Sequence, residues 1–226
     1  MTLCVYAITG PQPLSRAARG MGGEPLRLVR AGPIGAVVGE LPRVPRPTRG
    51  ALERYDAAIR QLHARRRAVL PARYGSCFAG PDEVAFVLRS RQASLRAALA
   101  HVRGRAQMTV RVLPRASRQD AAGAVPARIV NPSSRVRTTA GRGARYLQER
   151  AARTSGLAGF EPVREAVRRW VRAEQAETSG RIASVYHLVP RGAAGPYMRA
   201  AARAADAAGQ RVIITGPWPP YAFAGW

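Results

Sequence analysis

Ser76 and Cys77 come nearest to a catalytic pattern in this sequence. Both lie on a predicted loop between Gly75 and Gly80, and a loop thiol or hydroxyl beside glycines can act as a nucleophile once a base activates it. The surrounding residues do not form a Gly-x-Ser-x-Gly motif, and no neighbouring residue suggests the base. We therefore expect no catalysis by Cys77 and no catalytic residue elsewhere, which makes an enzyme the least favoured class.

Histidines and glycines give no sign of a metal or cofactor site. His63, His101 and His187 are isolated in the sequence, whereas a metal site needs further cysteine, histidine or carboxylate ligands at short spacing. Each histidine is expected to be a surface residue or a hydrogen-bonded structural one. The glycines at 20–23 are not followed by Gly-Lys-Ser/Thr and do not directly follow a strand, so they match neither a Walker nor a Rossmann loop. We expect no metal and no cofactor.

The charge of the chain suggests a polyanionic partner. Lysine and arginine total 37 against 13 acidic residues, for a net charge of +24, which is typical of proteins that bind nucleic acid or anionic surfaces. Every basic residue is an arginine, however, as coding bias in a GC-rich genome would produce, and the arginines are spread along the chain with few aromatics between them. Single-strand binders combine a basic groove with stacking aromatics. Nucleic-acid binding therefore stays as an alternative function, and no nucleic-acid partner is expected.

The compact basic run is Arg65, Arg66 and Arg67. Successive residues of a helix point to different faces, and cations are favoured near a helix C-terminus. A solvated helix end is thus favoured over a phosphate clamp.

Two cysteines, Cys4 and Cys77, lie far apart without a Cys-x-x-Cys motif. Reduced, partly buried thiols of a cytoplasmic protein are the expected state. Residues 1–9 lack a basic segment followed by a long apolar one, and no window approaches the roughly 20 apolar residues of a membrane span. Neither secretion nor membrane insertion is expected.

Apolar periodicity predicts an α+β arrangement in the first half of the chain. Strands are predicted at 3–8, 26–30, 34–39 and 107–113, the second and third as a hairpin. Thr48 is the expected N-cap of a helix whose apolar stripe, from Leu52 to Leu62, faces the sheet and which ends by Leu70, before Pro71. A second helix is predicted to run without a break over 81–102 and to close at Gly104.

The second half begins with a segment rich in Pro, Gly and Arg, residues 114–142, which we interpret as a linker. Helical periodicity resumes at Ala144 and, after a weak spot at 155–159, continues until Gly180. A strand at 183–189, a helix at 197–208 and a strand at 211–215 follow. These elements are typical of a small α+β sandwich.

Three prolines close to Trp218 should end both sheet and helix, so that the last residues run extended. Trp218, Tyr221 and Phe223 then need a surface to pack on. One interpretation folds this tail back over its own domain, the second one, and the other offers it to a partner.

Three segments occur in an order that is known from one family. Residues 69–78 read VLPARYGSCF, residues 143–147 read GARYL, and residues 216–223 read GPWPPYAF. Together they resemble the "VLP-x-R-F/Y-G-T/S-x-F", "G-x-x-YL" and "GPWPPYSF" segments of the gas vesicle accessory proteins of the GvpF/GvpL family, with Ala222 in place of the usual serine.

The resemblance implies two domains and a role without catalysis. It implies an N-terminal α+β domain, residues 1–113, the linker 114–142, and a C-terminal ferredoxin-like α+β domain, residues 143–226, with the aromatic-proline tail. It also implies a cytoplasmic assembly factor and minor vesicle component. Such a protein would bind the hydrophobic shell protein GvpA, together with other vesicle accessory proteins, and limit GvpA aggregation during nucleation.

A protein that holds an aggregating client needs an exposed apolar groove or sheet edge. We expect that surface in the cleft between the two domains, with Arg73, Tyr74, Trp218 and Tyr221 as the partner-binding residues. In the alternative interpretation both motifs are architectural: Arg73 is an internal ion-pair anchor, Gly75 a turn residue with positive φ, and Trp218 a packing lid.

Overall fold

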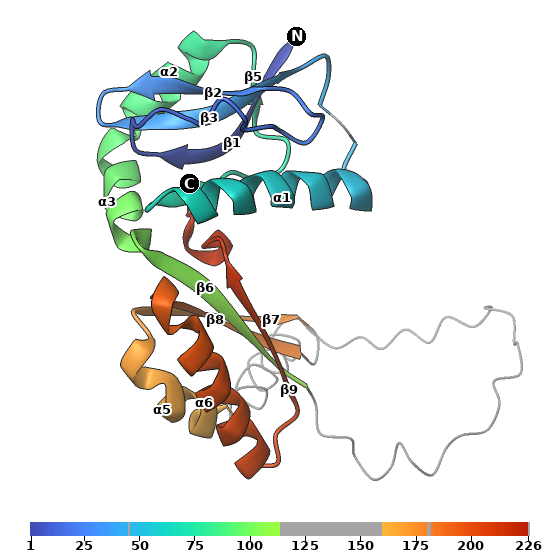
Figure 1. The fold of residues 1–226 in the computed structure, drawn as a ribbon, viewed down its shortest axis with the longest axis vertical. Helices are drawn as coiled ribbons and strands as arrows, with labels where there is room; N and C mark the ends of the chain where they lie inside the picture. Colours follow the sequence, from blue (N-terminus) through green and yellow to red (C-terminus); the bar gives the residue numbers. More distant parts are fainter. Residues whose placement is uncertain (45, 114–159, 180–181, 226) are drawn as a thin grey trace, which may run out of the picture.

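The computed structural model describes residues 1–44, 46–113, 160–179 and 182–225. Two antiparallel sheets, each covered by helices, lie one above the other in Figure 1. The predicted linker at 114–142 and the segment at 143–147 lie outside the described residues. An α+β fold is confirmed.

The first sheet has the order β2-β3-β1-β4, and the short β5 also pairs with β1. Its strands are β1 (Thr2–Thr9), β2 (Leu26–Ala31), β3 (Ile34–Leu41), β4 (Val69–Pro71) and β5 (Cys77–Phe78). The β2–β3 pair is antiparallel, which confirms the predicted hairpin. β1 is apolar and buried on both faces because helices cover the sheet from both sides.

Helix α1 (Arg49–Arg65) covers one face of this sheet. It starts where the sequence predicts, because the Thr48 side chain accepts a hydrogen bond from the backbone N–H of Ala51 at 3.3 Å. Tyr55 and Ile59 are buried against the sheet. Leu52 is not: it is 42% exposed, so its predicted place on the buried stripe is wrong.

Helices α2 (Pro81–Ser90) and α3 (Gln92–Val102) cover the opposite face. The prediction of one continuous helix here is wrong, since Arg91, with φ −111° and ψ 15°, separates them. α2 contacts β2, β3 and β5, whereas α3 contacts β4, β1 and β3. The break at Arg91 lets α2 and α3 each pack its own apolar face on the sheet.

The second sheet has the order β7-β8-β6-β9. Its strands are β6 (Arg105–Val112), β7 (Ala173–Ser179), β8 (Ile182–Pro190) and β9 (Val212–Trp218). Helices α5 (Glu161–Val167) and α6 (Ala194–Ala207) pack on one of its faces. β6 precedes the predicted linker yet lies in the middle of this sheet. The division into domains at 113 and 143 stays a prediction.

The predicted helix up to Gly180 is wrong in its second half. α5 ends at Val167, a 3₁₀ turn follows at Arg168–Trp170, and β7 begins at Ala173. β7 carries no strand-like alternation in sequence, but every residue of it pairs with β8. Tertiary pairing thus overrides the helical propensity of its alanines and glutamates.

The last strand is longer than predicted. β9 continues through Gly216 and Pro217 to Trp218, with a register shift opposite Gln107 and Thr109. A proline is tolerated because β9 is an edge strand. Gly216 has φ of +127°, and a Cβ there would lie 2.8 Å from the carbonyl oxygen of Gln107, so this position requires glycine.

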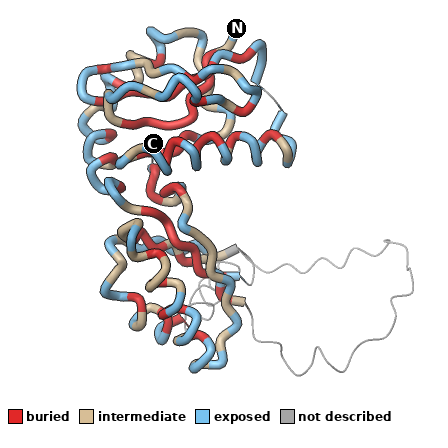
Figure 2. The backbone as a smooth tube through the Cα atoms, viewed as in Figure 1, coloured by how far each residue is buried: buried red, intermediate tan, exposed pale blue. Residues whose placement is uncertain are grey.

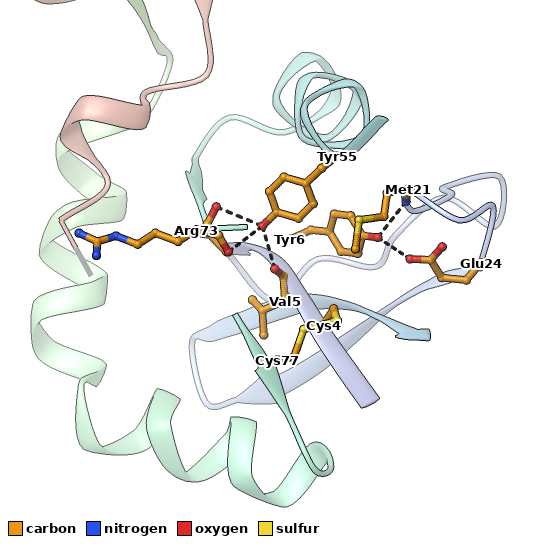
Figure 3. The surroundings of a disulfide bond; sticks show 9 residues. Cys4, Val5, Tyr6, Met21, Glu24, Tyr55, Arg73 and Cys77 are labelled. Atoms are coloured by element: carbon orange, nitrogen blue, oxygen red, sulfur yellow. Dashed lines mark hydrogen bonds between the residues drawn. A yellow bond between two sulfur atoms is a disulfide. The ribbon is translucent and has the colours of Figure 1, made fainter. Parts of the chain in front are cut away.

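Cys4 and Cys77 form a disulfide, with their Cα atoms 4.1 Å apart (Figure 3). The expectation of reduced thiols is therefore wrong. Their separation of 73 residues hides the fact that β5 pairs with β1 and sets the two residues opposite each other. Cys77 consequently carries no thiol that could act as a nucleophile.

Buried residues, red in Figure 2, occur in both sheets and in the C-terminal tail between them. One core cluster lies between the first sheet and α2 and α3, and it also includes Leu188 of β8 and Phe223 and Ala224 of the tail. Among the helices that the structure describes, none has the length and apolarity to cross a membrane.

Candidate functional site

The C-terminal tail lies between the two sheets. After β9 it forms a short 3₁₀ turn, Tyr221–Phe223, and the backbone N–H of Ala222 donates to Gln107 Oε1 of β6 at 2.8 Å. Phe223 is buried in the core of the first sheet, near His101 of α3. The tail thus packs on both sheets, on the second through Gln107 and on the first through Phe223, so the interpretation that folds it over the second domain alone accounts for only part of its contacts.

Two predicted site residues, Trp218 and Tyr221, contact α1. The Tyr221 hydroxyl donates to Asp56 Oδ1 at 2.5 Å. Asp56 is also paired with Arg60, whose guanidinium lies 5.2 Å from the centre of the Trp218 ring. A chain of polar and cation–π contacts therefore ties the tail to one stripe of α1.

Burial raises the pKa of Tyr221, and its hydrogen bond to Asp56 raises it further. The hydroxyl therefore keeps its proton at neutral pH and acts as a donor. Its contact with Asp56 is charge-assisted and fixes the direction of the tail.

The other two predicted residues, Arg73 and Tyr74, contact α1 at Tyr55, the residue before Asp56. The Tyr55 hydroxyl lies 3.3 Å from the carbonyl oxygen of Arg73, and the Tyr74 ring meets the Tyr55 ring edge-on at 5.2 Å. All four predicted residues thus meet α1 at neighbouring positions, Tyr55, Asp56 and Arg60.

The Arg73 side chain points away from the Tyr55 ring (Figure 3). It is exposed and forms no ion pair with the carboxylates that the structure describes, so the ion-pair-anchor interpretation is wrong. Gly75 has φ of +84°, which confirms the predicted turn.

A hollow of about 520 Å³ opens between the tail and the second sheet, and we call it the inter-sheet groove. Its lining residues are Gln107, Gln175, Ala176, Glu177, Tyr186, Tyr221 and Ala222. Of the predicted site residues, Tyr221 lines the groove directly, whereas Trp218 is not part of its lining and pairs through its backbone with Gln107, which is. Arg73 and Tyr74 are not part of its described lining.

The groove continues onto the face of the second sheet opposite α5 and α6, which we call the open sheet face. Strand register places Glu177, Ser184, Arg111 and Ile213 in one row across the four strands. Ile213 is 45% exposed on this face. A mixed polar and apolar surface of this kind can bind an extended or helical segment of another protein.

Sequence reasoning missed Asp56, Arg60 and the residues of β7 and β8 that line the groove. The one available signal lies in α1, where Leu52, Asp56 and Arg60 follow a spacing of four and so share one helical stripe. An exposed leucine on that stripe marks a face that meets something other than the sheet.

A second buried polar cluster surrounds His187. Its Nδ1 lies 2.6 Å from the Tyr197 hydroxyl and its Nε2 lies 2.8 Å from Glu174, which also binds Arg164. Burial lowers the pKa of His187. Burial would raise the pKa of Glu174, but hydrogen bonds from Arg164 and His187 turn the shift downward.

Within this cluster His187 and Tyr197 are fully buried, whereas the side chains of Glu174 and Arg164 are partly exposed. His63 is also buried and hydrogen-bonds the carbonyl oxygen of Arg105, and His101 is exposed. The predicted surface or structural roles of the histidines are confirmed. The described part of the chain holds no group of three metal-type ligands.

Comparison with known proteins identifies the whole fold. Residues 2–225 match the family described as "Gas vesicle synthesis protein GvpL/GvpF". The chain is 28% identical to "Gas vesicle protein L" of Streptomyces sp. (strain CB03234), over 98% of this chain and 92% of that protein.

Two solved structures share the fold. GvpF from Anabaena sp. PCC7120 superposes with a TM-score of 0.72 at 15% identity, covering 100% of this chain and 98% of its own. GvpF from Microcystis aeruginosa gives a TM-score of 0.75 at 13% identity, covering 100% of this chain and 99% of its own.

Proposed function

This chain belongs to the GvpL/GvpF family of gas vesicle synthesis proteins, and on that premise we propose that it is a non-enzymatic assembly factor that binds the hydrophobic shell protein GvpA. Binding would limit GvpA aggregation while a vesicle nucleates. Other vesicle accessory proteins would be its further partners, and it would act in the cytoplasm at the growing vesicle.

The observation that carries this proposal is the open sheet face next to the inter-sheet groove. α5 and α6 cover the other face of the second sheet, whereas Ile213, Tyr186 and Tyr221 line a surface that no described helix covers. An aggregation-prone client needs a partner surface that offers apolar contact without closing into a core.

The edge of β9 supplies a second means of capture. Its outer side pairs with no strand among the described residues. A strand of a client can therefore add there through main-chain hydrogen bonds, while its side chains contact Ile213 on the sheet face. The inter-sheet groove, which Tyr221 of the tail after β9 lines, would receive a bulky apolar side chain.

The test is co-purification of GvpA with the full chain after nuclease treatment. Trp218→Ala and Ile213→Glu should each reduce GvpA capture, because the first removes the ring that packs on Arg60 at the start of the tail and the second puts a charge on the open sheet face. Phe86→Glu is the matched control, since Phe86 is 65% exposed on α2, away from this surface.

All three variants must first show the thermal unfolding of the unchanged protein. Undiminished capture by folded Trp218→Ala and Ile213→Glu would remove this surface from the proposal. In a parallel purification without nuclease, retention of nucleic acid in place of GvpA would instead favour the alternative, a nucleic-acid-binding protein.

A further inference from the structure

A second concave surface lies beside the first sheet, between the C-terminal end of α1 and helix α3. We call it the basic cleft, and its volume is about 840 Å³. It is formed by four segments of the chain: residues 9–13 after β1, the β2–β3 turn at 33–34, residues 65–68 after α1, and the outer face of α3. None of these segments lines the inter-sheet groove.

The floor of the basic cleft is apolar. Ile34 and Leu99 are nearly fully buried at its base. Its other apolar lining residues are Pro11, Pro13, Pro33, Ala68, Ala93, Ala97 and Ala100. Short and rigid side chains of this kind leave a smooth surface on which aliphatic groups of a ligand can lie.

Arginines form the rim. Arg65, Arg67, Arg96 and Arg103 are exposed and line the cleft, and no acidic residue is among its described lining. None of the four pairs with a carboxylate in the part of the chain that the structure describes. Their guanidinium groups therefore have open hydrogen-bonding capacity that matches carboxylate oxygens.

Arg66 has a different task. Its guanidinium donates to Thr9 Oγ1 at 2.9 Å and to the carbonyl oxygens of Gly10, Gln12 and Pro13. It is half-buried, which lowers its pKa. These four contacts hold residues 9–13 in place as one wall, so the cleft is preformed.

Helix-end charge compensation accounts for Arg65 and for Arg103, the C-cap residue of α3, but not for Arg67 and Arg96. A helix C-terminus favours cations only within its last turn. In α1 that turn already holds His63 and Arg65, and in α3 it holds His101. Arg96 lies in the middle of α3, and Arg67 lies beyond the end of α1.

We propose that the basic cleft binds an acidic segment of a partner protein, with its carboxylates on the arginine rim and its aliphatic side chains on the floor. Because this surface differs from the one proposed for GvpA, the inference goes beyond that function. The occupant follows from charge complementarity and from the apolar floor. A single-stranded nucleic acid would instead call for aromatic stacking residues, and the described lining has none. A duplex would use the arginines through its phosphates but would leave the apolar floor without a partner.

The experiment measures binding of a fluorescent peptide of Glu, Leu and Ala to the full chain at about 0.15 M salt, where long-range attraction is screened. The matched peptide has Gln in place of Glu. The Glu peptide should bind and the Gln peptide should bind at least about tenfold more weakly. Equal binding of both peptides would overturn the proposal.

Two variants locate the binding. The triple variant Arg67→Gln, Arg96→Gln and Arg103→Gln should weaken Glu-peptide binding about tenfold or more. Ala97→Glu should also weaken it, because the new carboxylate occupies the rim from inside the cleft. All four positions are exposed, so the fold should remain intact.

The control triple is Arg43→Gln, Arg89→Gln and Arg199→Gln, which removes the same charge at exposed positions outside the cleft. It should lose less than about threefold. Equal loss in both triples would mean that net charge alone attracts the peptide, and the proposal would fall. It would also fall if duplex DNA bound more tightly than the peptide and lost that binding in the cleft triple.

Discussion

The hydroxyl of Tyr221 donates a hydrogen bond to the carboxylate of Asp56, although the two residues are 165 positions apart. This contact joins the C-terminal tail to α1. The same tail places Phe223 in the core of the first sheet and hydrogen-bonds Gln107 of the second. The last residues of the chain therefore hold the two sheets together, and their motif is architectural whatever else it binds.

Tyr221→Phe should lower the free energy of unfolding by about 1 kcal/mol, because the hydrogen bond to a charged acceptor is lost at a partly exposed site. Asp56→Ala should cost somewhat more, since it also removes the pair with Arg60. Urea unfolding of both variants and of their combination measures the coupling. Strictly additive losses would show that the contact is energetically silent.

Phe223→Ala should cost about 3 kcal/mol, because it empties a buried ring position in the core shared by both halves. Phe86→Ala is the control, since it makes the same substitution at a site that is 65% exposed. It should change the free energy of unfolding by less than about 0.5 kcal/mol. Thermal and urea unfolding give both values. Similar losses for the two variants would contradict the placement of the tail.

Cys4→Ala combined with Cys77→Ala should lower the free energy of unfolding by roughly 3 kcal/mol, because the disulfide closes a long loop. A reductant should weaken the unchanged protein to a similar degree and leave the double variant unaffected. The chain has only these two cysteines. If both are alkylated after denaturation without reductant, the disulfide is absent.

Stability should fall as the pH drops from about 6.5 to about 4 through His63. Burial and the nearby Arg191 lower the pKa of His63 from 6.5 to about 4 in the folded protein. As the pH falls, His63 is therefore protonated in the unfolded chain before it is protonated in the folded one. This protonation favours the unfolded state and lowers the free energy of unfolding. The stabilisation is complete above pH 6.5, and the loss by pH 4 is on the order of 3 kcal/mol.

His63→Gln keeps a donor for the Arg105 carbonyl but cannot titrate, so its urea midpoint should vary less between pH 7 and pH 5. His101→Gln, at an exposed position, is the control and should keep the slope of the unchanged protein. His187 is also buried with a lowered pKa, so a residual slope should remain in His63→Gln. An identical slope in all three proteins would refute the assignment.

Local sequence patterns were enough for much of the fold. Alternation of apolar residues predicted β1, the β2–β3 hairpin and β8, and the Thr48 cap predicted the start of α1, because these features depend on neighbours within a few residues. The ordered motifs near Arg73 and Trp218 were enough for the family. They could not tell which surface those residues form.

Long-range pairing decided the rest. Residues 173–179 form strand β7 because they pair with β8. Cys4 lies opposite Cys77 because β5 pairs with β1. Tyr221 hydrogen-bonds Asp56 because the tail after β9 packs against α1. Sequence periodicity describes what a segment does with its immediate neighbours. Residues distant in sequence are brought together only by the packing of whole elements, so the groove, the disulfide and the basic cleft emerged with the tertiary structure.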